Sequence, residues 1–379
     1  MNRTDIAIVG AGILGLAHAR AAAKRGLKVT VFERNPQAIG ASIRNFGMIW
    51  PIGQPQGHLL DRALKTRAIW LEVASQAGFH ADACGSLHLA YRSDEMAVLE
   101  EFMAAPRAID SLALLTPQQA AAKSPAIVTE NLLGALHSST EVIVDPREAI
   151  GKIPAFLAAV YGVDFKFGTA VTQVESSGHP TFIAGGESWT AQHLFVCSGV
   201  DFETLYPSVY ANSGITKVKL QMMRTAPQPD SFRLGAALCG GLTLTHYEAF
   251  AHCSSVSALK DRIATETPEF PRWGIHVMVS QNAAGELVIG DSHEYGLNPS
   301  PFDKAEINDR ILTYLKKFAK APSFEVAETW HGLYAKISGK TEFIVHPEPG
   351  VTIAQISGGI GMTLSFQIAE EGVASILGD

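Results

Sequence analysis

Apolar runs of two kinds alternate from the start of the chain. Residues 5–9 (DIAIV) and 28–33 (KVTVFE) are short and rich in β-branched residues, which predicts two buried strands. Between them, residues 16–26 (LAHARAAAKRG) have the composition of a helix. A strand, a helix and a second strand in this order predict the start of an α/β domain.

The same alternation continues along the chain. A helix is expected over 55–77, a strand over 85–91, and further helices up to about residue 122. After that come β-type runs, separated by Gly, Pro and Asp turns, at 182–186, 193–199 and 217–225. This mixture predicts an α/β nucleotide-binding domain that is interrupted by a second, more antiparallel sheet domain.

The first strand runs directly into a glycine-rich turn, Gly10-Ala11-Gly12-Ile13-Leu14-Gly15. Gly10 permits the tight turn, Gly12 lets a pyrophosphate approach the backbone, and Gly15 lets the helix pack closely on the strand. The free N–H groups of the helix N-terminus favour the phosphates. The second strand ends at Glu33, where a carboxylate accepts hydrogen bonds from ribose hydroxyls. Together these features predict a dinucleotide site, without deciding between FAD and NAD.

Composition narrows the class of protein. With 379 residues, 47% hydrophobic and 18% charged, the chain is long enough for two domains and has the balance of a compact enzyme. A net charge of -7 argues against a nucleic-acid partner. The four cysteines never form a CxxC pair, which disfavours a zinc knuckle and fits a reducing compartment. No apolar stretch reaches the roughly 20 residues of a membrane span, so a cytoplasmic protein that does not contact the membrane is expected.

Further motifs resemble, in chain order, the D-amino-acid oxidase family, which includes glycine oxidase and sarcosine oxidase. They lie at 40–50 (GASIRNFGMIW), 143–146 (IVDP), 168–174, 196–199 (VCSG), 219–225 (KLQMMRT), 286–291 (ELVIGD), 330–334 (WHGLY) and 358–363 (GGIGMT). The resemblance implies a Rossmann-like FAD-binding domain interleaved with an antiparallel-sheet substrate domain. The expected FAD-binding segments are 1–84, 143–216 and 329–379, and the expected substrate-domain segments are 85–142 and 217–328.

The motifs and the resemblance give a predicted set of FAD-binding residues. It comprises Gly10, Gly12, Ile13, Leu14, Gly15, Glu33, Arg34, Ala41, Ser42, Arg44, Asn45, Phe46, Gly47, Met48, Val171, Ser198, Gly199, Gly358, Gly359, Ile360, Gly361, Met362 and Thr363. Backbone N–H groups of the last loop would stabilise the negative charge that a reduced flavin carries. Gly332 stands where covalent-flavin relatives carry a cysteine, so FAD is expected to be held non-covalently.

The combination of ASIRNFGMIWP, LTLTHYEAF and GDSHEYG looks like a branch of this family associated with phosphonate breakdown. The implied substrates are 2-aminoalkylphosphonates, including N-methylated ones. Amino-acid oxidases of this fold commonly carry a carboxylate-binding Arg after Trp-x-Gly, whereas this chain has Tyr334-Ala335-Lys336. Lysine binds phosphate-like groups as a point charge, so Lys336 and Lys340 are candidate anchors. The alternative is that both are solvated surface lysines.

Several other side chains are candidates for the substrate pocket. His246 and Tyr247 lie in one β-like run, and His276, His293 and Tyr295 lie in or beside others. The predicted catalytic set is Tyr247, His246, His276, His293, Tyr334 and Lys336, although a histidine in a strand is more often structural. The possible metal-ligating side chains are too far apart along the sequence to indicate a metal site. Met222, Met223 and Met278 are expected in the core.

The predicted reaction is hydride transfer from the carbon beside a neutral amine to flavin N5, followed by hydrolysis of the imine to an aldehyde and an amine. Molecular oxygen would then reoxidise the flavin. Three alternatives stay open: a glycine, sarcosine or D-amino-acid oxidase, a flavin dehydrogenase with a quinone or protein acceptor, and an FAD-stabilised scaffold without catalysis. The sequence leaves the exact substrate, its stereochemistry and the oligomeric state undetermined.

Overall fold

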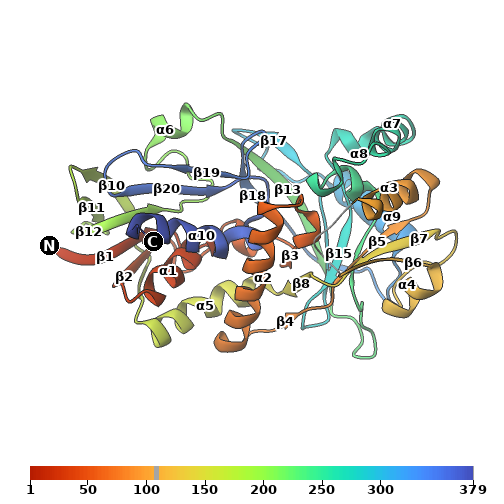
Figure 1. Ribbon diagram of the computed structural model, residues 1–379, viewed down its shortest axis with the longest axis horizontal. Helices are drawn as coiled ribbons and strands as arrows, with labels where there is room; N and C mark the ends of the chain where they lie inside the picture. The colour runs from red at the N-terminus through yellow and green to blue at the C-terminus, as the bar shows by residue number, and fades with distance from the viewer. Residues whose placement is uncertain (106–110, 379) are drawn as a thin grey trace.

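Two large sheets lie at opposite ends of the molecule, and the long strands β13 (Thr216–Thr225) and β18 (Val326–Lys336) extend between them (Figure 1). The computed structural model describes residues 1–105 and 111–378. Within these residues no helix is both long and apolar enough to cross a membrane.

The first sheet has eight strands in the order β10-β11-β12-β1-β2-β9, with β20 paired to β12 and β19 to β20. Its strands are β1 (Asn2–Val9), β2 (Val29–Glu33), β9 (Asp164–Phe167), β10 (Val171–Ser176), β11 (Pro180–Ala184), β12 (Glu187–Val196), β19 (Glu342–Val345) and β20 (Val351–Ile356). Strands β20, β12, β1, β2 and β9 run parallel. Every residue of β2 is buried, which is why the central strands read as continuous apolar runs.

Helices cover this sheet. They are α1 (Ile13–Lys24), α2 (His58–Ala77), α5 (Pro146–Tyr161) and α10 (Gly361–Leu377), and α1 packs against both α5 and α10. Asp145 caps α5 by accepting hydrogen bonds from the N–H groups of Arg147 and Glu148, at 2.8 and 3.3 Å. The Asp145-Pro146 pair therefore starts a helix, as Asp at the N-cap and Pro at the first position commonly do. The short helix α6 (Pro207–Ala211) follows β12.

The second sheet has nine strands in the order β17-β13-β16-β15-β14-β5-β7-β6, with β18 paired to β13. Its other strands are β5 (Ser86–Ala90), β6 (Leu112–Leu115), β7 (Gly134–Ser138), β14 (Ala237–Cys239), β15 (Met278–Gln281), β16 (Leu287–Gly290) and β17 (Glu294–Gly296). The helices of this half are α3 (Ser93–Ala104), α4 (Pro117–Lys123), α7 (Val256–Glu266), α8 (Glu269–Arg272) and α9 (Ala305–Phe318). All of these pairs are antiparallel except β14 with β5.

A three-stranded sheet, in the order β3-β8-β4, is formed by β3 (Met48–Ile49), β8 (Val142–Val144) and β4 (Ala81–Asp82). It joins segments that lie near two of the predicted domain boundaries. Strand β18 runs across a third, at residue 329. Met222, Met223 and Met278 are buried, as the sequence predicted.

The prediction that His246 and Tyr247 lie in a β-like run is wrong. Residues Gly241–Thr245 form a 3-10 helix (η3), His246 follows it, and Tyr247 precedes a second 3-10 turn (η4, Glu248–Phe250). The hydroxyls of Thr243 and Thr245 donate to backbone carbonyls three residues earlier, at 2.6 and 2.9 Å. Such local bonds compete with strand pairing, and apolar alternation alone did not reveal them.

Candidate functional site

A cavity of about 820 Å³ opens where the parallel strands of the first sheet end. It is lined by Gly10, Gly12, Ile13 and Leu14 after β1, by the end of β2 and by residues that follow β12 (Cys197 to Asp201). The loop that follows β20 closes one side, through Gly359, Gly361 and Met362. Ligands of open α/β sheets bind at this position, beyond the carboxyl ends of the strands.

The glycine turn has the geometry that the sequence predicted. Gly10 has φ +99°, and a side chain there would place its Cβ 2.4 Å from the carbonyl oxygen of Cys197. A Cβ at Gly15 would lie 1.9 Å from the carbonyl oxygen of Gly10, so Gly15 does not line the cavity but allows α1 to pack on β1. Gly12, Ile13 and Leu14 line the cavity at the N-terminus of α1. The backbone there is bare enough for a phosphate group to approach closely.

Glu33 is held in a fixed position at the end of β2. Its carboxylate accepts hydrogen bonds from the Ala11 N–H, the Asn35 N–H and the Asn35 side-chain amide, each at 3.0 Å. Glu33 nevertheless lines the cavity and is 9% exposed. Next to it, Arg34 pairs with Asp201 at 2.8 Å. A carboxylate oriented in this way fits a ribose.

The loop after β2 is only partly in the cavity. Ala41, Ser42, Arg44 and Asn45 line it, and the Ser42 hydroxyl accepts from the Ile13 N–H at 2.9 Å. The remaining predicted residues of this loop, Phe46, Gly47 and Met48, do not line it. Gly47 instead packs on β8, because a Cβ there would lie 1.9 Å from the carbonyl oxygen of Val144.

The C-terminal loop is divided in the same way. Gly359, Gly361 and Met362 line the cavity, while Gly358, Ile360 and Thr363 do not. The Thr363 hydroxyl accepts from the Trp50 N–H at 3.0 Å, so it connects the loop to the small sheet. Helix α10 begins at Gly361, so its N-terminus lies at the cavity.

Val171, Ser198 and Gly199 also line the cavity. Several further residues line the cavity that were not among the predicted FAD-binding residues: Thr169, Ala170, Thr172, Val200, Asp201, Thr204, Leu205 and Gln355. Thr169, Ala170 and Thr172 lie within the motif at 168–174, whereas the others belong to no motif recognised in the sequence. Their position at the ends of β10, β12 and β20 identifies them as cavity residues.

Tyr334 and Lys336, the predicted anion-binding segment, end β18 beside the C-terminal loop. Tyr334 lines the cavity, whereas Lys336 does not. The Lys336 ammonium lies close to the loop, 3.3 Å from where a Cβ of Gly358 would stand. Among residues 1–105 and 111–378 this ammonium has no ion-pair or hydrogen-bond partner. Lys340 is exposed in the turn that follows.

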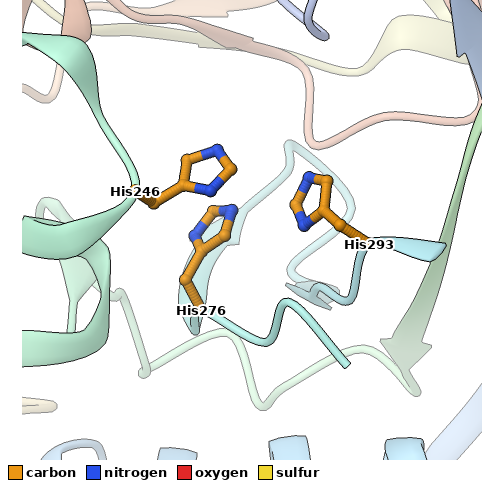
Figure 2. A group of neighbouring side chains, drawn as sticks. All are labelled: His246, His276 and His293. Carbon is orange, nitrogen blue, oxygen red and sulfur yellow. The ribbon is translucent and has the colours of Figure 1, made fainter. Parts of the chain in front are cut away.

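The fold brings the three predicted histidines together (Figure 2). Ring centroids are 3.8 Å apart for His246 and His276, 4.8 Å for His246 and His293, and 5.2 Å for His276 and His293. One nitrogen from each ring lies within 4.8 Å of the others. The premise that these residues are too spread to converge was wrong, because spacing along the sequence does not report distance in the fold. None of the three lines the large cavity.

Two tyrosines link the histidine cluster to its surroundings. The Tyr247 ring lies 5.1 Å from that of His246, and its hydroxyl contacts the Met278 sulfur at 3.2 Å. The Tyr334 ring lies 6.3 Å from that of His293 and also lines the cavity. The cluster therefore lies next to the end of the cavity that Gly359 and Tyr334 form.

Burial controls the protonation of this region. His246 keeps an accessible surface, but it lies deep among packed elements, where loss of hydration and the neighbouring cations lower its pKa well below the usual value. Burial also lowers the pKa of His293. It raises the pKa of the Tyr247 and Tyr334 hydroxyls well above the usual value. At neutral pH these two imidazoles are uncharged and both phenols are hydrogen-bond donors.

The chain belongs to the family of FAD dependent oxidoreductases designated DAO, whose pattern matches residues 5–374. The protein is therefore an FAD-dependent oxidoreductase. FAD fits the cavity at the strand ends, where the side-chain-free Gly10 and Gly12, the oriented Glu33 carboxylate and the N-termini of α1 and α10 converge.

Individual relatives agree with this assignment. Glycine oxidase of Geobacillus kaustophilus (strain HTA426) is 24% identical over 363 residues, which cover 92% of this chain and 85% of that protein. The structure of glycine oxidase from Bacillus cereus ATCC 14579 matches with a TM-score of 0.78 at 19% identity, covering 99% of this chain and 95% of that one. The structure of L-proline dehydrogenase from P. horikoshii matches with a TM-score of 0.75 at 18% identity, covering 99% and 93%. These matches confirm the predicted α/β fold.

Proposed function

We propose that the protein oxidises the carbon beside the nitrogen of a small amine that carries a tetrahedral anionic group, a 2-aminoalkylphosphonate or its N-methyl derivative. The observation that carries the proposal is the Lys336 ammonium, which lies beside the Gly358 loop and has no carboxylate partner among the described residues. A point charge suits a phosphonate, whereas a carboxylate is typically held by the planar fork of an Arg. Tyr334 occupies the part of the cavity next to it.

Bound FAD supplies the chemistry by accepting a hydride from the carbon beside the amine. The chain supplies orientation and electrostatics. The N-terminus of α10, with the bare backbone of Gly359 and Gly361, favours negative charge at that end of the cavity. The buried surroundings favour the neutral form of the substrate amine, which is the form able to lose a hydride. The hydroxyls of Tyr247 and Tyr334, kept protonated because burial raises their pKa, are available to donate hydrogen bonds to the substrate.

The resulting imine would hydrolyse to an aldehyde and an amine, with oxygen as the electron acceptor. A second candidate is oxidation of an amino acid such as glycine, which the names of the glycine oxidases favour. A third is transfer of electrons to a quinone or protein, for which the L-proline dehydrogenase gives a precedent of the same fold. Peroxide yield in air separates the first two from the third.

The decisive experiment mixes the FAD-loaded protein anaerobically with single amines and follows bleaching of the visible flavin band. The panel contains 2-aminoethylphosphonate, its N-methyl derivative, glycine, sarcosine and D-alanine. The proposal expects both phosphonates to bleach the flavin at least tenfold faster than any amino acid at equal concentration. Faster bleaching by glycine or sarcosine would contradict the phosphonate assignment, and no bleaching by any amine would contradict amine oxidation.

A lysine variant locates the anion. Lys336→Met should raise KM for 2-aminoethylphosphonate by about ten- to a hundredfold with little change in kcat, because the phosphonate is bound equally in ground and transition states. Lys65→Met, at an exposed position of α2, is the matched control and should leave KM unchanged. Loss of FAD affinity without a change of KM would place Lys336 in the cofactor site instead.

A further inference from the structure

Three imidazoles from three separate segments converge next to the cavity. His246 follows the 3-10 helix η3, His276 lies just before β15 and His293 lies just before β17. Figure 2 shows the rings of His246 and His276 side by side, with His293 facing them from another segment. The histidines are brought together by tertiary packing, because no single helix, strand or turn contains more than one of them.

The cluster leaves hydrogen-bonding capacity unused. His276 is 3% exposed, yet its Nδ1 has no hydrogen-bond partner among the described residues. His293 donates from Nδ1 to the Gly274 carbonyl at 2.9 Å, which leaves its Nε2 as a free acceptor, 3.9 Å from the nearer Asp291 oxygen. Buried polar atoms are almost always paired. The unpaired Nδ1 of the buried His276 therefore indicates a missing ligand in the cluster.

The surroundings favour an anion over a metal cation. The Lys336 ammonium lies close enough to lower the proton affinity of both His246 and His293, and such a charge opposes a second cation. The rings of His246 and His276 are stacked, with 27° between their planes, so their in-plane lone pairs do not converge on one ion. Zinc requires imidazole nitrogens directed at it from about 2.0–2.1 Å.

Among the residues that the structure describes, Asp291 is the acidic group that faces the cluster. Oδ1 of Asp291 lies 3.0 Å from His276 Nε2, which is ion-pair distance without a hydrogen bond, so this carboxylate offsets the charge of one protonated imidazole. The other titratable groups facing the cluster are neutral or cationic: Tyr247, Tyr295, Tyr334 and Lys336. Asp291 is therefore close enough to balance the charge of His276 alone. His246, His293, Lys336 and the phenol hydroxyls remain available to interact with a bound anion.

We propose that His246, His276 and His293, together with Lys336, form a receptor for a tetrahedral dianion, and that the imidazoles take up a proton when the dianion binds. This inference rests on the proposed function in one respect, since it names the residues that would hold the phosphonate group of the substrate. The receptor itself can be tested without turnover. Protonated imidazoles in this cluster would repel one another and the Lys336 ammonium, and two negative charges placed between them remove that penalty. A carboxylate carries only one negative charge, so its binding to the protonated cluster is weaker.

The test is calorimetric titration of the FAD-loaded protein with sulfate, which stays a dianion across the working pH range, so that any pH dependence belongs to the protein. Titrations in two buffers of different ionisation enthalpy measure the protons taken up. The expected result is net proton uptake, binding that weakens up to tenfold per unit as the pH is raised from 6.5 to 8, and acetate binding at least tenfold weaker than sulfate. Inorganic phosphate should compete with sulfate.

Variants assign the effect to the cluster. His276→Gln and His246→Gln should each weaken sulfate binding at least tenfold and reduce the proton uptake. His137→Gln, in β7 and outside the cluster, should change neither. The visible flavin spectrum and the thermal midpoint of each variant show whether it is folded. If His276→Gln does not fold, His246→Gln alone decides, since its side chain is more exposed.

Three outcomes would overturn the proposal: sulfate binding that is insensitive to both variants, sulfate binding without proton uptake, or stoichiometric binding of Zn²⁺ alone that His276→Gln abolishes. Failure here is distinct from failure of the proposed substrate. Histidine-dependent sulfate binding in a protein that oxidises only glycine would retain the receptor and reject the phosphonate substrate. Oxidation of phosphonates with a KM that neither histidine variant changes would retain the phosphonate substrate and reject the receptor.

Discussion

Glu33 combines two roles at a single carboxylate. It closes the turn after β1 by accepting the Ala11 N–H, and it fixes the next loop through Asn35. It also lines the cavity where a ribose fits. Its effect on FAD binding therefore includes both a direct contact and the shape of the turn.

Replacement of Glu33 separates these contributions. Glu33→Ala should weaken FAD binding by about 1 to 3 kcal/mol, the usual cost of losing hydrogen bonds to a charged group. Fluorescence titration of the apoprotein with FAD measures this change. Glu33→Gln, which keeps the shape and one acceptor, should lose less. Equal affinity for the alanine variant and the wild type would show that the ribose does not contact Glu33.

His18 makes stability depend on pH. It is 1% exposed, its Nδ1 donates to the Leu14 carbonyl at 2.8 Å, and burial lowers its pKa to about 4. Its folded pKa lies below the unfolded value of about 6.5. The unfolded state therefore binds more protons between these two values, so the free energy of unfolding falls as the pH drops from about 6.5 to 4.

The contribution of His18 can be isolated. A shift of this size corresponds to a loss of up to about 3 kcal/mol, and His18→Gln should remove that part of the slope. Urea unfolding at pH 7 and pH 5 with saturating FAD measures it. His179→Gln, at an exposed position, is the control and should keep the wild-type slope. Identical slopes for wild type and His18→Gln would exclude this role.

At the scale of elements, the contact between β1 and α1 depends on the absence of a side chain. A Cβ at Gly15 would lie 1.9 Å from the Gly10 carbonyl oxygen, and the helix would have to move away from the strand. Gly151, in the exposed part of α5, has no neighbour within 4 Å of such a Cβ. Both glycines lie in helices, but only Gly15 has neighbouring atoms where a side chain would stand, so Gly151 is the control for Gly15.

Alanine at these two positions should have opposite effects. Gly15→Ala should lower the thermal midpoint and weaken FAD retention, because the dinucleotide turn is displaced. Gly151→Ala should raise the free energy of unfolding by about 0.5 to 1 kcal/mol, the usual gain from replacing glycine inside a helix. Thermal unfolding of the two FAD-loaded variants checks both. A stable, FAD-retaining Gly15→Ala variant would contradict the packing argument.

Elements could be predicted where one local signal dominated. Strands β1, β2 and β13 and helix α2 lie where the apolar runs and helical periodicity placed them, whereas β12 begins at Glu187, before the predicted run at 193–199. Strand β6 was missed because it is short and lies between helices, and the segment around His246 was mistaken for a strand. In both places tertiary contacts or threonine side-chain bonds outweigh the local pattern.

For the whole molecule, the arrangement of cysteines bears on how FAD is held. Gly332 lines the cavity and offers no thiol, while Cys197 lines it next to Gly10 with burial raising its thiol pKa. A protonated, buried thiol is a poor nucleophile. We therefore expect non-covalent FAD.

Acid precipitation tests this expectation. The purified protein should be yellow, and acid should release the colour into the supernatant and leave a colourless pellet. Colour retained in the pellet would contradict it. In that case Cys197→Ala would show whether the only cysteine among the described cavity residues forms the link.

The sequence by itself determined the dinucleotide turn, the acid at the end of the second strand and the order of family motifs, because each depends on residues that are neighbours along the chain. The tertiary structure decided which predicted residues reach the cavity: Gly359 does, and Gly47 does not. It alone brought His246, His276 and His293 together. Side chains on separate loops become neighbours only through the packing of two sheets, and no local pattern encodes that distance.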